Sequence, residues 1–371
     1  MDLTLTPEQE LIRRSAREFV DREITPHVRD WDRAETMDRA IVEKLAEIGF
    51  LAGWELDTVS YSLVMEELGR ADSSVRGIVS VNVGLVGKTI LKWGTDEQQQ
   101  EWLPRLASGE TLGCYALTEP GAGSDPGSLA TRAERDGDGW TISGSKIFIT
   151  LGTWAGLALV FARTGEEITC FLVPTDSPGF EAHPIKGKLG LRAQDTGELT
   201  LDGVRVPAPN VLGEVGGGLR VALSALDNGR ISLAAGCVGI GQGCLEACLS
   251  YTSERRQFGR SIASFQLVQE LLAEIAVETE AARLLTWRAA LAADAGVRHT
   301  LESSIAKYYA SEAAVRAANA AVQIHGGYGY IDEYPVGKYL RDARVTTLYE
   351  GTSQIQKLII GRALTGENAF L

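Results

Sequence analysis

The spacing of apolar residues changes twice along the chain, and this change limits the possible folds more than any other feature. Residues 1–112 have helical spacing, and residues 6–9 begin the first helix with a threonine cap, a proline and, three residues after the cap, a glutamine. From 113 to about 212, short β-branched runs such as residues 158–162 are separated by turns rich in glycine and proline. Helical spacing returns after the glycine-rich residues 213–218.

This order predicts an α+β fold of three domains. We expect a helical domain at 1–112, a β-barrel or sandwich at 113–215 and a second helical domain at 216–371. A broad apolar stripe predicts that one C-terminal helix belongs to a bundle. The stripe consists of Leu267, Val268, Leu271, Leu272 and Ile275.

Charge excludes one class of partner. The formal net charge is -13, from 36 basic and 49 acidic side chains, whereas nucleic-acid binding requires neutralisation of phosphates. The N-terminus has no basic segment followed by an apolar one, and no run of about 18 uncharged apolar residues occurs. We therefore predict a cytoplasmic protein that binds neither nucleic acid nor a membrane.

The five cysteines predict neither disulfides nor a metal site. They stand at 114, 170, 237, 244 and 248, without a C-x-x-C pair, and an odd number without an export signal argues against a disulfide framework. Cys244 and Cys248 are four residues apart on an expected helix, but no histidine is near them in the sequence to complete a metal site.

Two segments could carry chemistry. Residues 349–352 put a carboxylate, Glu350, beside a glycine just after the cationic run 338–344, so Glu350 is either a general base or a solvated surface charge. Residues 118–125 form a Gly/Ser loop after an expected strand. This loop is either an anion-binding backbone or a simple Pro-Gly turn.

Three arginines are also candidates. Arg76 interrupts an apolar helical stretch, so it either points to solvent or meets an anion. Arg230 belongs to residues 227–230, which we expect to open the first long C-terminal helix, where it could form a helix-start ion pair. Arg255 follows a helical run and could be a basic helix end that the helix dipole favours.

Four segments together resemble the acyl-CoA dehydrogenase family in their order and separations: residues 118–125, 255–259, 323–327 and 349–352. The resemblance runs from the first helix to the C-terminus. It implies a C-terminal four-helix bundle, FAD as cofactor, and oxidation of an acyl thioester to its α,β-enoyl product. It also implies electron-transferring flavoprotein as acceptor, and a homo-oligomer, expected to be a tetramer, in which neighbouring subunits share each FAD.

The resemblance also implies roles for individual residues. Glu350 would take the α-proton, because the position where some relatives carry the base is Gly229 here. FAD would be bound by Tyr115, Leu117, Thr118, Gly123, Ser124, Phe148, Thr150, Arg255, Phe258, Gln266, Gln323, Gly326, Gly327, Thr352 and Gln354. Within this set, Thr150 would lie near flavin N5, and Arg255 would reach a neighbour's FAD. Acyl-CoA would be bound by Ser124, Arg76, Asp227, Arg230, Tyr349 and Gly351.

The substrate is the least determined part of this prediction. Arg76 matches the arginine that binds the distal carboxylate in the glutaryl-CoA dehydrogenase branch, but that branch's acidic partner falls at Gly69 here, and the loop at 53–60 is short. The usual tryptophan is Phe148, and His325 stands where an aliphatic residue is common. A short, branched or dicarboxyl acyl-CoA is therefore expected. The alternatives are an acyl-carrier-protein thioester and a flavin-binding scaffold without dehydrogenase activity.

Overall fold

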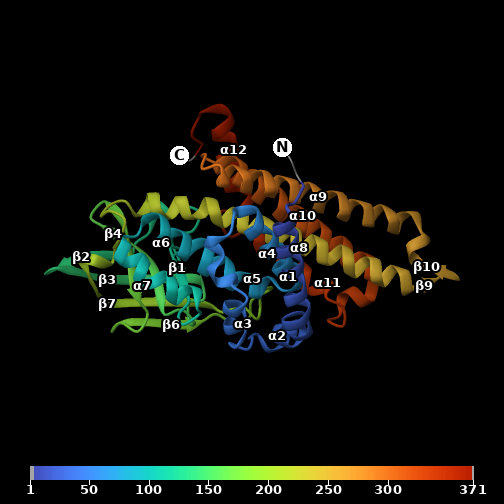
Figure 1. The fold of residues 1–371 in the computed structure, drawn as a ribbon, viewed down its shortest axis with the longest axis horizontal. Coiled ribbons are helices and arrows are strands. Elements are labelled where there is room, and N and C mark those ends of the chain that lie inside the picture. The colour runs from blue at the N-terminus through green and yellow to red at the C-terminus, as the bar shows by residue number, and fades with distance from the viewer. Residues whose placement is uncertain (1–3, 370–371) are drawn as a thin grey trace.

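The N-terminal part of the chain is helical in the computed structural model, which describes residues 4–369 (Figure 1). Its α-helices are α1 (Pro7–Glu23), α2 (Val28–Ala34), α3 (Ile41–Glu47), α4 (Thr58–Ala71), α5 (Ser73–Val79), α6 (Lys88–Trp93) and α7 (Asp96–Ala107). A π-helical segment, η3 (Ser80–Gly87), joins α5 to α6. The predicted start of the first helix is confirmed, since Thr6 and Gln9 exchange two side-chain to backbone hydrogen bonds in a capping box.

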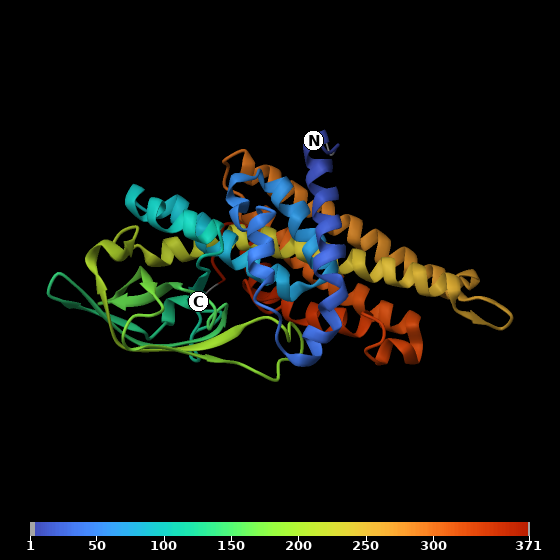
Figure 2. The same ribbon diagram turned by 60° about the horizontal axis from the view of Figure 1, so that its bottom comes forward.

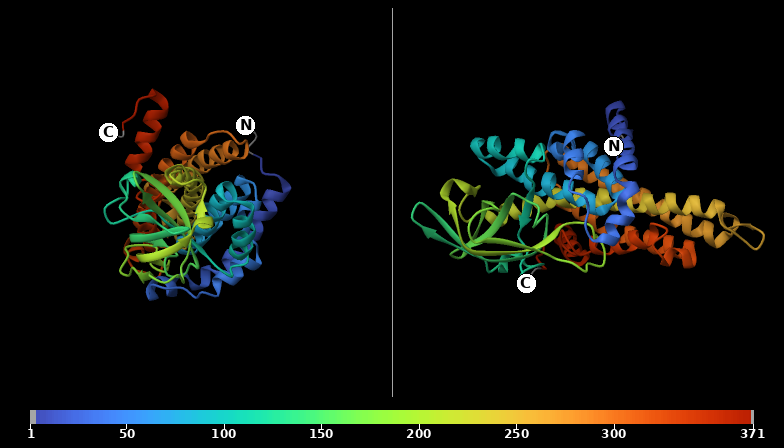
Figure 3. Two further views of the ribbon diagram at one scale, coloured as in Figure 1. Left: turned by 90° about the vertical axis from the view of Figure 1, so that its left-hand side faces the viewer. Right: turned by 90° about the horizontal axis from the view of Figure 1, so that it is seen from below.

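The middle of the chain forms one eight-stranded sheet. Its strands are β1 (Gly113–Ala116), β2 (Arg132–Asp136), β3 (Gly139–Thr150), β4 (Leu157–Thr164), β5 (Glu167–Pro174), β6 (Phe180–Pro184), β7 (Thr196–Pro207) and β8 (Val211–Leu212). The order is β6-β7-β3-β2-β4-β5-β8, and β1 pairs in parallel with β4. The N-terminal helices lie along one side of this sheet (Figure 3). Loops at the sheet therefore come close to helices from the first part of the chain.

The C-terminal part is again helical. It contains α8 (Gly218–Glu254), α9 (Gln266–Asp294), α10 (Thr300–His325), α11 (Val336–Thr346) and α12 (Ser353–Thr365), with a small hairpin of β9 (Arg256–Gln257) and β10 (Arg260–Ser261) after α8. Helices α8, α9 and α10 pack against one another, α11 packs on α8 and α10, and α12 packs on α10. Helix α8 runs from the sheet to the hairpin at the opposite end of the molecule (Figures 1 and 2).

The expected start of α8 was wrong. Residues 227–230 do not open the helix, because α8 begins at Gly218. The helix can start there because Gly218 lies against β5, where a Cβ would come within 2.6 Å of the Thr169 carbonyl carbon. Asp227 and Arg230 are therefore interior residues of a long helix, in agreement with the return of helical spacing after residues 213–218.

Glycines let α4 and α8 approach until their backbones touch. A Cβ on Gly69 would lie 2.3 Å from the Gly236 carbonyl oxygen, and a Cβ on Gly239 would lie 2.0 Å from the Glu66 carbonyl oxygen. A Cβ on Gly236 would also lie 2.2 Å from Cδ of Arg76. These three glycines therefore hold two helices together and leave space for one buried arginine.

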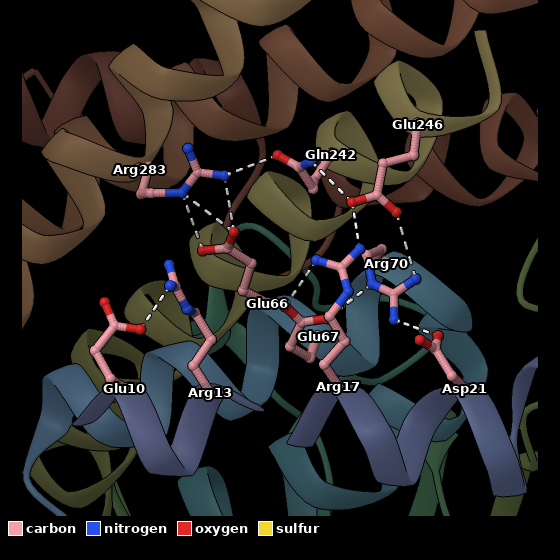
Figure 4. Close-up of polar contacts among 10 residues, drawn as sticks. All are labelled: Glu10, Arg13, Arg17, Asp21, Glu66, Glu67, Arg70, Gln242, Glu246 and Arg283. Carbon is pink, nitrogen blue, oxygen red and sulfur yellow. Dashed lines mark hydrogen bonds and ion pairs between the residues drawn. The ribbon is translucent and has the colours of Figure 1, made fainter. Parts of the chain in front are cut away.

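A network of ion pairs joins α1 and α4 to α8 and α9 (Figure 4). Arg283 of α9 donates to Glu66 of α4 at 2.8 Å, and Arg17 of α1 pairs with Glu246 of α8. The network also includes Asp21, Glu67, Arg70 and Gln242. Because Glu66 and Glu67 are buried, these contacts supply the opposite charges that their carboxylates need.

Two helical stretches of the described residues are long and apolar enough to be compared with membrane spans. They are Ser73–Trp93 and Gly218–Glu254, and 89% and 78% of their most apolar windows are buried inside the protein. Packing within the core accounts for their composition.

Candidate active site

A cleft of about 1560 Å³ lies where the three parts of the chain meet. It receives side chains from α5, β1, β3, α8 and the loop between α11 and α12. Most of the predicted site residues line it: Arg76, Tyr115, Leu117, Thr118, Gly123, Ser124, Phe148, Thr150, Asp227, Arg230, Tyr349, Glu350 and Gly351. The structure thus brings together residues that are up to 275 positions apart, from 76 to 351.

Glu350 stands in a strained turn that several donors hold. Its φ is 58°, in the left-handed region, and Gly351 follows with φ 84°. The Glu350 carbonyl accepts from Nε2 of Gln356 at 3.0 Å and Nε of Arg230 at 3.4 Å, and the Gly351 carbonyl accepts from Nζ of Lys307 at 2.7 Å. A non-glycine residue persists in this region only where its surroundings determine the conformation. The turn is therefore built to aim the Glu350 side chain.

The Glu350 carboxyl group is buried against a glycine. Its Oε2 atom has no hydrogen-bond partner among residues 4–369 and would lie 2.5 Å from a Cβ on Gly229. Burial raises the pKa of Glu350 to about 7, although the cations Arg230, Lys307 and Arg76 act in the opposite direction. A carboxyl group with this pKa at a cleft is suited to proton transfer near neutral pH.

Arg76 lies beside this turn, and its burial excludes the first of its two expected states. It is 2% exposed, so it does not point to solvent, and its NH2 nitrogen donates to the Tyr349 hydroxyl at 2.7 Å rather than to an anion of the protein. Its NH1 nitrogen is buried and has no partner within the described part of the chain. Its partner comes from the loop after α11, and the expected contact with a substrate anion stays a prediction. The guanidinium keeps one donor free at the cleft.

Asp227 and Arg230 form an ion pair at 2.7 Å, and Asp227 also accepts a hydrogen bond from the Thr300 hydroxyl at 2.7 Å. Both residues line the cleft, and Arg230 is buried. The pair therefore fixes the direction of Arg230 at the wall next to Glu350.

The wall formed by β1 and β3 suits a planar aromatic cofactor. Phe148 has φ 60° and leaves 65% of its surface exposed at the cleft, although it is a large apolar residue. Thr118 and Thr150 provide hydroxyl groups, and a Cβ on Gly123 would meet nothing within 4 Å, so the loop leaves room for a ligand. An uncovered ring with hydroxyls and an open glycine loop fits the isoalloxazine and phosphates of FAD.

A buried ion pair holds this wall in position. Lys146 of β3 is fully buried, and its Nζ donates to Glu119 at 2.7 Å and to the carbonyl groups of Leu117 and Phe161. Glu119 in turn accepts from the backbone N–H groups of 130 and 131. Strands β1, β3 and β4 are thereby connected behind the cleft-facing residues.

A second pocket, of about 480 Å³, collects another group of predicted residues near the hairpin. Arg255, Gly326 and Gly327 line it together with Tyr251 and His325. The hairpin and the sheet lie at opposite ends of the molecule (Figure 1). The predicted FAD residues of one chain are thus divided between two distant places.

Five predicted FAD residues line neither pocket. Phe258 is 93% exposed in the hairpin with φ 52°. Gln266, Gln323 and Gln354 are also exposed, and Thr352 caps α12 by accepting from the Ile355 N–H at 3.2 Å. Their predicted role in cofactor binding stays a prediction.

The fold brings a histidine close to the cysteine pair, although none is near it in the sequence. Nδ1 of His325 lies 4.0 Å from Sγ of Cys248, because α8 and α10 pack side by side although the two residues are 77 positions apart. Still, no group of three or more potential metal ligands occurs within residues 4–369. All five cysteines are buried free thiols.

Sequence reasoning missed four residues at the site. Lys307 and Gln356 hold the Glu350 turn, and Gln194 and Ser80 line the cleft. None of them belongs to a recognisable motif in the sequence. The apolar surroundings of Lys307 on α10 were the single available signal, since a lysine is rarely fully buried without a function or a partner.

Comparison with known proteins identifies the family. The acyl-CoA dehydrogenase N-terminal, middle and C-terminal domain models match residues 6–110, 114–204 and 216–365. The chain belongs to the acyl-CoA dehydrogenase family. It is 41% identical over 364 residues to the mitochondrial short-chain specific acyl-CoA dehydrogenase of Mus musculus, covering 95% of this chain and 88% of that one. It is 42% identical over 378 residues to the probable acyl-CoA dehydrogenase YngJ of Bacillus subtilis, covering 98% and 100%.

Solved structures of the family match over nearly the full length. Butyryl-CoA dehydrogenase from Megasphaera elsdenii has a TM-score of 0.96 at 37% identity, covering 98% of this chain and 100% of that one. Glutaryl-CoA dehydrogenase from Mycobacterium smegmatis in complex with FADH2 has 0.96 at 37%, covering 99% and 97%. A chain from a structure described as the electron transferring flavoprotein of Acidaminococcus fermentans has 0.97 at 39%, covering 99% and 100%.

One similar structure differs in its thioester carrier. The prolyl acyl carrier protein oxidase AnaB has a TM-score of 0.94 at 31% identity, covering 98% of this chain and 100% of that one. The predicted family, three-domain fold and FAD cofactor are confirmed, and the chain is an oxidoreductase of the acyl-CoA dehydrogenase type.

Proposed function

We propose that this enzyme oxidises a short-chain acyl-CoA thioester to its α,β-enoyl product, with Glu350 as the base. The main support is that Glu350 lines the cleft and has a buried carboxyl group whose Oε2 has no partner in the described residues. The thioester carbonyl makes the α-hydrogen acidic, and Glu350 takes it as a proton while the pair of electrons forms the new double bond. FAD, when bound, accepts the β-hydrogen as a hydride.

The test is Glu350→Gln in the FAD-loaded protein. The amide has nearly the same shape but cannot accept the α-proton, so FAD and acyl-CoA binding persist while anaerobic flavin reduction slows by about two to four orders of magnitude. Near-normal reduction would assign the base to another residue. Because the pKa of Glu350 is about 7, wild-type reduction is expected to become faster as pH rises through 7.

We propose that FAD is shared between subunits of a homotetramer, the assembly typical of the family. Two features support this. The cofactor residues of one chain lie in two distant pockets, and Val277, Leu284 and Leu291 expose 67%, 36% and 37% of their surface at seven-residue spacing along α9. Arg255→Ala should weaken FAD retention and the oligomer together. Retention of FAD at high dilution equal to that of the wild type would contradict the shared site.

The acyl group is proposed to be short and able to carry a second carboxylate. Arg76 has a buried NH1 donor without a partner among residues 4–369, and one donor of this kind can bind a carboxylate at the end of the acyl chain. Arg76→Gln should then raise KM for glutaryl-CoA selectively, by about 1.5–3 kcal/mol in binding free energy. Equal effects on butyryl-CoA and glutaryl-CoA would assign the enzyme to monocarboxyl substrates.

The second candidate function keeps the chemistry and changes the carrier. Similarity to an acyl carrier protein oxidase favours an acyl-carrier-protein thioester as substrate. Assaying one acyl group on both carriers separates the two. We also propose electron-transferring flavoprotein as the acceptor and the cytoplasm as the location, supported by the similarity to the Acidaminococcus chain and to bacterial relatives.

A further inference from the structure

We infer that Gln194 is a positioning residue that directs the Thr150 hydroxyl into the cleft as a hydrogen-bond donor to the flavin. The inference rests on the proposed function in one respect, namely that Thr150 faces the reactive edge of FAD. Gln194 belongs to no motif recognised in the sequence. Its role follows from its contacts with Thr150 and Gly77.

Gln194 reaches the cleft from the loop between β6 and β7. Its side chain is buried, with 7% of the residue exposed, and its Nε2 nitrogen donates to Oγ1 of Thr150 at 3.0 Å. The other end of the amide, Oε1, lies 2.0 Å from where a Cβ on Gly77 would be. Gly77 can offer only C–H groups there, so an NH₂ group turned toward it would lose its acceptor. The surroundings therefore fix the amide with its donor toward Thr150.

The hydrogen bond from Gln194 restricts the Thr150 hydroxyl. A hydroxyl has one hydrogen and two acceptor lone pairs. Gln194 occupies one lone pair, so the hydroxyl hydrogen must point elsewhere. Among residues 4–369 the Thr150 hydroxyl donates to no acceptor, and Thr150 is half-buried at the cleft. The hydrogen is thus left to donate to whatever occupies the cleft.

The loop that carries Gln194 is held on both sides of the amide. The Gln194 N–H donates to the Leu191 carbonyl at 3.1 Å, and the Gln194 carbonyl accepts from Nζ of Lys188 at 2.8 Å. The next residue, Asp195, accepts from the Thr153 hydroxyl at 2.6 Å. This arrangement holds the amide in place before any ligand binds, as a positioning residue requires.

The direction of the Thr150 hydroxyl should affect how easily the bound flavin is reduced. Flavin N5 has a free lone pair in the oxidised form and bears a hydrogen in the reduced form. Because the Gln194 donor keeps the hydroxyl hydrogen out of one direction, this hydrogen points toward the cleft more often than that of a freely rotating hydroxyl, and this favours the oxidised form. Removing the Gln194 donor should make the bound cofactor easier to reduce.

The experiment is a double-mutant cycle on the FAD-loaded protein without acyl substrate. Gln194→Met removes the donor with similar volume, and Thr150→Val removes the hydroxyl. Gln194→Met is expected to raise the ratio of reduced to oxidised FAD, at a fixed potential, by about threefold to tenfold, as for one hydrogen bond. In the Thr150→Val background the same change should have no further effect. The visible absorption spectrum of bound FAD provides a second readout.

Two further variants control for the fold. Gln98→Met removes another buried glutamine, one that donates to the carbonyl groups of 209 and 211 away from the cleft, and it should leave the ratio unchanged. Gly77→Ala leaves Gln194 intact but puts a methyl group where Oε1 lies, so it should shift the ratio in the same direction as Gln194→Met.

Three outcomes would overturn the inference. If Thr150→Val shifts the ratio and Gln194→Met does not, Gln194 is only structural and the proposed site stands. If Gln194→Met shifts the ratio equally with and without the Thr150 hydroxyl, Gln194 acts by another route. If Thr150→Val changes neither ratio nor spectrum, Thr150 does not contact the flavin, and that part of the proposed function fails as well.

Discussion

At the scale of residues, the position of the Glu350 carboxyl depends on the absence of a side chain at Gly229. A Cβ at 229 would lie 2.5 Å from Oε2 and 2.9 Å from the carboxyl carbon, both too close. Gly229→Ala should therefore displace the carboxyl group and slow flavin reduction by at least tenfold, with FAD binding intact. Stopped-flow reduction by butyryl-CoA measures this. Gly361→Ala on α12 is the matched control, because no atom lies within 4 Å of its Cβ position, and a similar loss there would contradict the argument.

The burial of Glu350 should also make the free energy of unfolding depend on pH. Its pKa is about 7 in the folded protein, against an ordinary value of 4.5, so the folded state keeps a proton that the unfolded state releases between these pH values. The free energy of unfolding therefore falls as pH rises from about 4.5 to about 7. Glu350→Gln should raise Tm relative to wild type at pH 8 and leave it nearly equal at pH 4.5, as measured by calorimetry.

An exposed carboxylate is the control for this pH effect. Glu134→Gln removes a charge on the surface of β2 and should not produce the same difference between the two pH values. A Glu350→Gln variant with an equal Tm difference at both pH values would mean that the carboxyl is not buried as described.

At the scale of elements, the buried Lys146–Glu119 pair should hold together the strands behind the cleft wall formed by β1 and β3. Removing one partner of a buried pair leaves the other charge without compensation, at a cost of about 3–5 kcal/mol. Glu119→Gln should therefore destabilise strongly, and adding Lys146→Met should restore part of the loss. Denaturant unfolding of the four proteins in the cycle measures the coupling. Additive losses would show that the two side chains do not act as a pair.

The elements themselves were largely predictable, because helical and strand periodicity depend on local sequence. The capping box at Thr6 and the change from helices to strands are examples. The start of α8 is the exception: helical spacing returns after residues 213–218, but the expected helix start was 227–230, whereas α8 begins at Gly218 against β5.

Part of the candidate site was also predictable from the sequence, and part of it was not. The segments around Glu350 and Thr118 have a characteristic local sequence, so resemblance to a family could find them. Partners of the site residues come from elsewhere: Lys307, which donates to the Gly351 carbonyl, is 43 positions before Glu350, and Gln194, which donates to Thr150, is 44 positions after it. Isolated residues of this kind carry no local pattern, and only tertiary structure shows what they contact.

At the scale of the whole molecule, the exposed stripe on α9 should be a subunit contact. Val277→Glu puts a charge at a position that is 67% exposed in the single chain, and burying that charge in an interface would be costly. We expect the oligomer to dissociate at micromolar concentration, as measured by analytical ultracentrifugation. Leu11→Glu on α1, where Leu11 is 51% exposed, is the matched control and should leave the oligomer intact. An unchanged oligomer in Val277→Glu would exclude this face of α9.

The ion network that joins α1 and α4 to α8 and α9 determines when the protein can finish folding during translation. Glu66 leaves the ribosome 217 residues before Arg283, and Arg17 leaves it 229 residues before Glu246. At about 5–20 residues per second, α4 waits roughly 10–40 s for the cation that neutralises its buried carboxylate. The nascent N-terminal helices are therefore incomplete for most of synthesis, and a chain stalled before α9 would expose them to chaperones and proteases.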